Sequence, residues 1–168
     1  MTKNTIQKVF RHYKTIPLGS NGQIVLTFFD AAAGSAGTLA ADCNWPQNGN
    51  SLPDGILFIL KKIGFDIRKA DGSAIAPATL GAIANGFFMF QKSQREVREG
   101  SLREFISNPV TGQTLFKPGP VFNEIDIAEQ IQPKETISFT LTLNLAAATT
   151  EAVIISPLLK GLETISYN

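Results

Sequence analysis

The chain has 168 residues, of which 43% are hydrophobic and 17% are charged, and its formal net charge is +1. Soluble domains usually carry about 25% charged residues, and a net charge near zero argues against a globally basic nucleic-acid binder. The single cysteine, Cys43, excludes an intramolecular disulfide framework, and no apolar run approaches the roughly 20 residues that span a bilayer. We expect one domain, made in a cytoplasm, whose sparsely charged surface is covered by partner subunits.

The first predicted element is a basic N-terminal arm over residues 1–16, followed by a single domain over residues 17–168. No acidic residue precedes Asp30, and an apolar stripe fits either an amphipathic helix or an extended segment. Its unopposed cations could contact nucleic acid or an anionic lipid surface, or the segment could have no electrostatic role. Removal of residues 1–14 is expected to leave the domain folded but to impair assembly. The candidate residues of the arm are Lys3, Lys8, Arg11, His12 and Lys14.

Strands are predicted over residues 23–30 and 56–68, on either side of a long loop that contains Trp45. We interpret Trp45 as a plug at the end of the sandwich, with a sugar-stacking platform or an interface anchor as the alternatives. Residues 73–80 are predicted to be a loop around a proline. Residues 86–91 contain four consecutive apolar residues, a pattern typical of a strand that is covered on both faces.

The segment over residues 94–106 is highly charged, and it is predicted to be either a solvated strand pair or a short helix after Ser101. Because its positive and negative charges are interspersed, pairing between subunits or within one face is the simplest interpretation. The cluster consists of Arg95, Glu96, Arg98, Glu99, Arg103 and Glu104. Short strands are also expected at residues 115–116 and 121–127.

The most regular strand is predicted over residues 135–145, where apolar residues alternate strictly with threonine, serine and asparagine. One face should be buried, and the other carries hydroxyl and amide groups but no charge. Such a neutral face suits a sheet that something else partly covers. We expect this strand to lie beside the 56–68 strand in one sheet. A final strand is expected at residues 152–155.

Together these patterns predict about eight strands and no long helix. Parallel sheets require helical crossovers, so the sheets should be antiparallel. The predicted fold is therefore an all-β, antiparallel, eight-stranded two-sheet sandwich of jelly-roll type, because the connections are too long for an up-and-down barrel.

No catalytic or metal-binding residues and no cofactor are assigned. His12 and Cys43 could form a nucleophilic pair in space, but an incidental histidine and a structural cysteine are the simpler interpretation. Glu124 and Asp126 share one strand face, where solvated carboxylates are more common than an acid–base pair. A metalloenzyme of the cupin kind would bring several histidines onto its strands, and this chain has one histidine.

Four segments carry a resemblance to a known family. They are the basic stretch 8–14, the strand 22–29, Leu-Pro-Asp-Gly at 52–55 and Gln-Pro-Lys-Glu at 132–135, which precedes the threonine-rich strand. In strand order the chain resembles the small single-jelly-roll major capsid proteins of tailless icosahedral bacteriophages that contain an internal membrane. No functional residue transfers by motif.

The resemblance implies a structural capsid subunit that self-assembles into an icosahedral shell and is not an enzyme. It implies capsomers of this chain, contacts with other capsid proteins, an N-terminal segment facing lipid or a neighbouring subunit, and no specific recognition of nucleic acid. The expected location is the virion, after synthesis in the host cytoplasm. The alternative hypothesis is a carbohydrate- or ligand-binding β-sandwich, such as a virion spike or receptor-binding protein, that uses Trp45.

Overall fold

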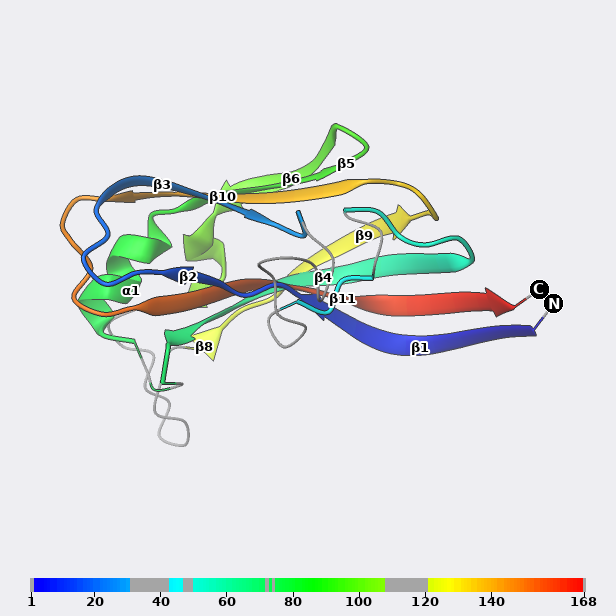
Figure 1. The fold of residues 1–168 in the computed structure, drawn as a ribbon, viewed down its shortest axis with the longest axis horizontal. Coiled ribbons are helices and arrows are strands. Elements are labelled where there is room, and N and C mark those ends of the chain that lie inside the picture. The colour runs from blue at the N-terminus through cyan, green and yellow to red at the C-terminus, as the bar shows by residue number, and fades with distance from the viewer. Residues whose placement is uncertain are drawn as a thin grey trace.

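The structure, a computed structural model, describes residues 2–30, 43–46, 50–71, 73, 75–107 and 121–167. They form two antiparallel β-sheets that pack face to face around a hydrophobic core (Figure 1). This is the all-β two-sheet sandwich that the sequence predicts. Among the described residues, no helix has the length and apolar character needed to cross a membrane.

The first sheet has the strand order β1-β11-β4-β9, and β2 pairs with β11 as well. Its two longest strands, β4 and β11, pair with each other at the centre of the sheet. A bulge at Lys160 and Gly161 accommodates the extra residue Lys61 of β4. The strands are β1 (Thr2–Arg11), β2 (Lys14–Ile16), β4 (Ile56–Lys69), β9 (Ile125–Ile131) and β11 (Val153–Tyr167).

The second sheet has the strand order β3-β10-β5-β6. A two-residue turn joins β5 to β6, and its residues Ser93 and Gln94 both have positive φ, as a type I′ hairpin turn requires. The strands are β3 (Gly22–Phe28), β5 (Phe87–Lys92), β6 (Arg95–Ser101) and β10 (Ile137–Leu145). A separate short pair consists of β7 (Ile106–Ser107) and β8 (Val121–Phe122).

The strand order is that of a jelly roll. When β1 and β2 are taken as one interrupted strand and the β7–β8 pair is set aside, eight strands remain in the part of the chain that the structure describes. In chain order, the first, eighth, third and sixth strands form one sheet, and the second, seventh, fourth and fifth form the other. The chain therefore crosses between the sheets at each connection except the β5–β6 hairpin. The predicted jelly-roll architecture is confirmed.

The predicted pairing of the 56–68 and 135–145 strands is wrong. The first corresponds to β4, which pairs with β9 and β11, and the second to β10, which pairs with β3 and β5. The two strands face each other across the core instead, where the rings of Phe65 and Phe139 lie 5.7 Å apart. Alternation identifies which face of a strand is buried, but it does not identify the neighbouring strand.

The segment predicted to be a basic arm is extended, but it is part of the first sheet and does not form a separate arm. β1 pairs with β11 along its length, and β2 continues the pairing. Phe10 and Ile16 point into the core and are fully buried. A strand that supplies core side chains and ladder hydrogen bonds is integral to the sandwich.

Residues 73–80 were predicted to be a loop, but a short helix, α1 (Pro77–Ala84), begins there. Its proline stands at the start of the helix, where the missing N–H has no intrahelical partner to lose. The charged segment 94–106 forms β6 and then the single 3-10 turn η1 (Leu102–Glu104). The strand predicted at residues 115–116 lies outside the described residues.

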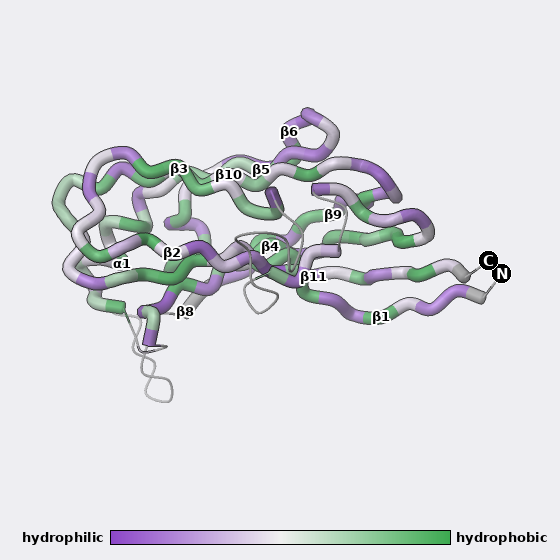
Figure 2. Tube along the Cα trace, viewed as in Figure 1, coloured by the Kyte–Doolittle hydropathy of each residue, from purple (hydrophilic) through white to green (hydrophobic). Residues whose placement is uncertain are grey.

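The core between the sheets is built mainly from phenylalanine. The ring of Phe139, on β10, contacts the rings of Phe28, Phe65, Phe88 and Phe90 at centroid distances of 5.7 to 6.1 Å. These distances lie in the range of favourable aromatic pairs. Hydrophobic residues recur along the strands of both layers, and hydrophilic residues gather at the tip of the β5–β6 hairpin (Figure 2).

Candidate functional site

The outer face of the second sheet is uncharged over most of its width. On β10 the residues with odd numbers are buried, so Thr140 and Thr142 point outward as the sequence predicts. The strand register extends this face sideways, because Val25 and Phe87 flank Thr142 on the neighbouring strands. We call this surface the neutral face, and its residues are Gln23, Val25, Thr27, Phe87, Met89, Gln91, Ser138, Thr140, Thr142 and Asn144.

Two large apolar side chains of the neutral face are exposed, Val25 by 59% and Phe87 by 43%. Charge first appears at the margin, on β6, where Glu99 lies opposite Met89. The apolar run of β5 predicted a strand covered on both faces. Phe88 and Phe90 are buried in the core, but Phe87 on the other face is only partly covered by the described residues. Burial of this surface against a partner would remove apolar area from water without stripping water from a charge.

Among the described residues, the edge strand next to the neutral face has none of the usual protection against pairing. β3 lies at the edge of the second sheet, and its sequence contains no charge, no proline and no irregularity in its register with β10. Natural proteins usually protect such edges with lysine, proline or a bulge. The open β3 edge and the neutral face are continuous, since Val25 belongs to both.

Sequence reasoning did not single out Val25 or Phe87, although each breaks a pattern. Val25 is an apolar residue on the polar side of an alternating strand, and Phe87 is the outward member of an apolar run. Both deviations from the pattern can be recognised in the sequence of the strand alone. Their meaning depends on the strand order, because only the sheet places the two residues on either side of Thr142.

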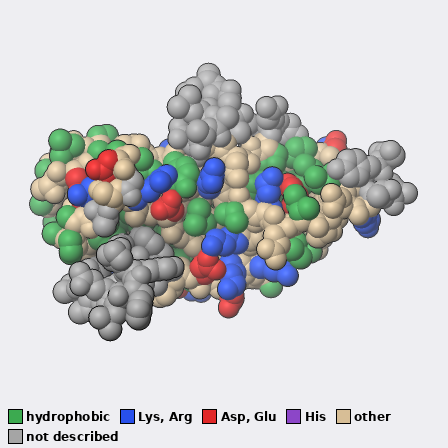
Figure 3. All heavy atoms as spheres, turned by 90° about the horizontal axis from the view of Figure 1, so that it is seen from below, with side chains coloured by type: hydrophobic (Ala, Val, Ile, Leu, Met, Phe, Trp, Pro, Cys, Tyr) green, Lys and Arg blue, Asp and Glu red, His purple; other side chains and the backbone are tan. Residues whose placement is uncertain are grey.

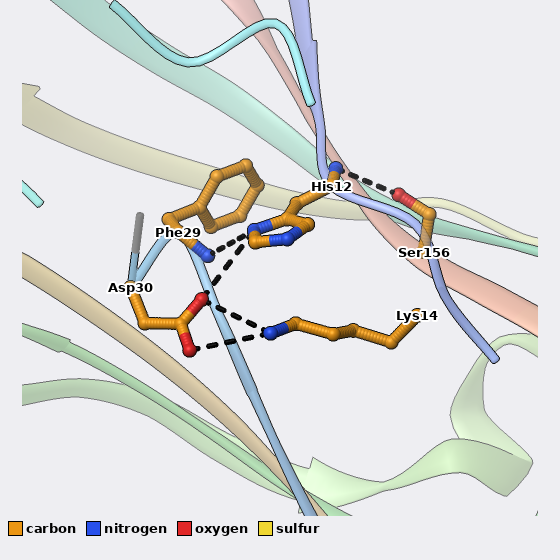
Figure 4. A network of polar contacts seen from close by, with 5 residues as sticks. All are labelled: His12, Lys14, Phe29, Asp30 and Ser156. Carbon is orange, nitrogen blue, oxygen red and sulfur yellow. Dashed lines mark hydrogen bonds and ion pairs between the residues drawn. The ribbon is translucent and has the colours of Figure 1, made fainter. Parts of the chain in front are cut away.

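His12 lies buried where the first sheet approaches the end of β3. Its Nδ1 atom accepts a hydrogen bond from the Phe29 N–H at 2.8 Å, and its backbone N–H donates to the Ser156 hydroxyl at 3.0 Å (Figure 4). The carboxylate of Asp30 lies 3.7 Å from the same Nδ1 and accepts from the Lys14 ammonium at 3.2 Å. Phe29 has φ of 58°, which is rare for a bulky residue. The network fastens the two sheets together at this point.

The structure brings Cys43 next to His12 through an isolated backbone bridge. Both residues are almost completely buried. Neither residue lines either of two surface hollows formed by described residues. A nucleophile must reach its substrate, so this geometry favours a structural role for the pair. Within the described ranges, no three His, Cys, Asp or Glu side chains are grouped as metal ligands would be.

The sequence indicated that the cations of the N-terminal segment are unopposed, but the structure pairs two of them with acidic residues. Lys8 lies 3.6 Å from the buried carboxylate of Glu163, and Lys14 pairs with Asp30. The guanidinium of Arg11 lies over the ring of Tyr13 at 5.8 Å. The partners Glu163 and Asp30 are distant in sequence, and only the fold brings them together.

Three members of the charged cluster of β6 and η1, namely Arg95, Arg98 and Glu104, form ion pairs within the chain. Arg95 bonds to Glu129 at 2.9 Å, and Arg98 bonds to Glu104 at 2.5 Å. Arg103 donates to the side chain of Asn85. Glu96 and Glu99 are exposed, and no described residue pairs with them.

Trp45 is fully buried and packs against Phe10 and Phe29 at ring distances of 4.8 and 5.4 Å. Its indole N–H is buried without a hydrogen-bond partner among the described residues. In this position Trp45 fills the core as a plug would, and its ring has no exposed face on which a sugar could stack.

The outer side of the first sheet carries a shallow hollow of about 580 Å³. Its cations are Lys8, Lys61, Lys62 and Lys160, and Glu124 bonds to the last two. Basic side chains are spread over this side of the molecule with acidic ones among them (Figure 3). Asp126 also pairs with Lys62, so the predicted solvated carboxylates are surface ion pairs.

The hydrogen bond from Lys160 holds the pKa of Glu124 below its ordinary value of 4.5, against the opposing effect of burial, and the charges of Lys160 and Lys62 add to it. A lowered folded-state pKa means that the ionised carboxylate stabilises the fold. This contribution is present above pH 4.5 and is lost as the pH falls through the lowered pKa.

We expect the Lys160→Gln variant to lose less stability than the wild type between pH 6 and pH 3, by under about 1 kcal/mol, as for exposed ion pairs. Urea unfolding at a series of pH values measures the difference. The matched control is Lys134→Gln, which removes the more exposed ion pair with Asp54 and should change the acid dependence less than Lys160→Gln does. Equal acid sensitivity of Lys160→Gln and the wild type would contradict the assignment.

Comparison with known proteins finds no matching family model, no matching curated protein and no matching solved structure. The features of the described residues that bear on function are the neutral face, the β3 edge and the jelly-roll order.

Proposed function

We propose that the chain is a structural subunit of an icosahedral viral shell, which assembles with copies of itself and carries out no catalysis. The observation that carries the proposal is the neutral face, an uncharged sheet surface with Val25 and Phe87 exposed beside an unprotected edge strand. The jelly-roll order supports it further, because this is the order that the resemblance to phage capsid proteins implies. This support from the fold is an analogy, and the surface is the physical argument.

The neutral face can be buried against a second copy at a low cost in desolvation free energy, because it carries no charge. Threonine, serine and glutamine side chains can exchange hydrogen bonds with the same side chains of a second copy, and Val25 and Phe87 gain from burial. An extended β3 edge can at the same time pair with the β3 edge of a neighbour. A stable contact between copies should bury upwards of about 1,000 Å².

The proposal places the chain in the virion, in capsomers made of this chain and in contact with other capsid proteins. In it, β1 and β2 are part of the shell wall, because they belong to the sandwich. Any contact with an internal membrane would then involve the exposed basic residues of β1, such as Lys3 and Arg11.

The proposal is tested by placing a charge on the neutral face. We expect the wild type to form oligomers or shells in negative-stain images and in sedimentation velocity at increasing concentration. The Val25→Lys and Phe87→Lys variants should remain monomeric, since assembly would bury an unpaired ammonium.

The matched control is Val9→Lys, which changes an exposed apolar residue of the first sheet, 41% exposed, and should assemble as the wild type does. A wild type that stays monomeric at high concentration would overturn the proposal. Equal loss of assembly in Val9→Lys would show that the contact is not on the neutral face.

A further inference from the structure

The free edge of the first sheet is protected over only part of its length. β1 is the edge strand of this sheet. At the C-terminal end of β1, the side chain and backbone of Asn44 form hydrogen bonds with the outward backbone groups of the strand. Asn44 accepts from the Arg11 N–H at 2.7 Å and donates to the carbonyls of Val9 and Arg11 at 2.8 and 3.1 Å. The backbone groups of Val9 and Arg11 therefore point away from β11.

The same geometry fixes which other groups point outward. Backbone groups alternate in direction along a strand, so those of Lys3, Thr5 and Gln7 also point away from β11. The contact between the Thr5 and Thr164 hydroxyls at 3.0 Å agrees, because side chains are closest at positions whose backbone groups do not bond across the pair. Residues 3–7 are all exposed, and no described residue bonds to these outward groups.

We propose that the Lys3–Gln7 edge of β1 is a docking site for an extended acidic segment of another protein, which joins the first sheet as an additional strand. β1 contains three cations and no acidic residue. Lys8 is neutralised by Glu163, whereas Lys3 and Arg11 have no acidic partner among the described residues. Lys3 and Arg11 share one face of β1 and bracket the free stretch, about 26 Å apart in an extended strand.

The charge distinguishes this edge from the edge at β3. Lysine on an edge discourages pairing with a second copy, because two basic strands would lie side by side. β3 has no such charge and suits contacts between identical chains. On the opposite face of β1, Ile6 is 41% exposed in the middle of the free stretch. The geometry therefore favours a partner strand with acidic side chains on one face and apolar ones on the other.

This inference goes beyond the proposed shell role and does not depend on it. Its test is an amide NMR titration with a capped nine-residue peptide that alternates Glu and Val, carried out on the full chain with the Val25→Lys substitution, which lies on the other sheet and should keep the chain monomeric. We expect shifts centred on the amides of Lys3, Thr5 and Gln7, with binding weakened at least tenfold when lysine replaces glutamate in the peptide. Raising the salt concentration should weaken binding as well.

The discriminating variant is Thr5→Pro, which removes an outward N–H and leaves the β1–β11 hydrogen bonds in place. We expect it to weaken binding at least tenfold, whereas Thr5→Val, which keeps the N–H, should bind as the wild type does. Lys3→Glu provides a second variant that does not touch the backbone, and it should reverse the preference between the two peptides.

Three results would overturn the proposal: no amide shifts with the acidic peptide, equal binding of the lysine peptide, or full binding by both Thr5→Pro and Lys3→Glu. A self-association of the wild type that Thr5→Pro abolishes would also overturn it, since the occupant would then be a second copy. Failure of the shell proposal, in contrast, appears in the Val25 and Phe87 variants and leaves this titration unchanged.

Discussion

Removal of residues 1–14 is expected to unfold the protein. The deletion takes away β1, the fully buried Phe10 and the buried His12 that joins the two sheets. Phe10 packs against the rings of Trp45 and Phe58, each at 4.8 Å. Loss of a buried phenylalanine alone costs about 3–5 kcal/mol, a large share of the roughly 5–15 kcal/mol that stabilises a domain. Circular dichroism and thermal unfolding measure the outcome.

This expectation replaces the prediction from sequence, in which the same deletion left the domain folded. The matched control is a deletion of residues 1–4, which keeps Phe10, His12 and most of the β1–β11 pairing. That shorter deletion should lower stability by no more than about 1 kcal/mol, because Lys3 and Asn4 are exposed. A chain without residues 1–14 that unfolds at the wild-type temperature would show that β1 is dispensable.

The Phe139→Ala variant is expected to lose about 4 kcal/mol of stability. Phe139 is fully buried on β10, and its ring touches four other phenylalanine rings from both sheets. Its truncation removes the transfer free energy of the ring and leaves a cavity that the rigid strands around it cannot fill. Urea unfolding followed by the fluorescence of Trp45, the single tryptophan, measures the change.

Phe87→Ala is the matched control, since it makes the same chemical change on the neighbouring strand β5 at a side chain that is 43% exposed. We expect it to cost less than about 1.5 kcal/mol, because much of the ring is already in water. Equal losses in the two variants would mean that Phe139 is not the centre of the core. A change in the slope of the urea dependence would point to altered compactness instead of altered packing.

Patterns confined to neighbouring residues could be predicted from the sequence. The alternation in β10 identified its buried and outward faces, and the hydroxyl-rich outer face is where the structure places it. The turn residues and the absence of long helical patterns gave the fold class. These signals are local because a strand has a period of two whatever lies beside it. Helix α1 was not predicted because its sequence is short and contains Ala and Gly. Such a segment is helical only where side chains such as Leu80 and Ile83 are buried against the rest of the protein.

The candidate site could be predicted only in part, because it combines residues that are distant in the sequence. The neutral side chains of β10 were identified, but Val25 and Phe87 join them only through the strand register. The basic segment was read as four unopposed cations, whereas Glu163 and Asp30 neutralise two of them from distant positions. The burial of Trp45 agrees with its interpretation as a plug, but its ring partners Phe10 and Phe29 could not be identified from the sequence.

The sequence by itself determined the class of fold, the buried face of each regular strand and the shortage of surface charge. Only the tertiary structure decided which strands are neighbours, that residues 2–16 belong to the sandwich, and which charges are neutralised. The physical reason is that side-chain period is a property of one strand, while pairing and ion contacts depend on the free energy of bringing distant segments together.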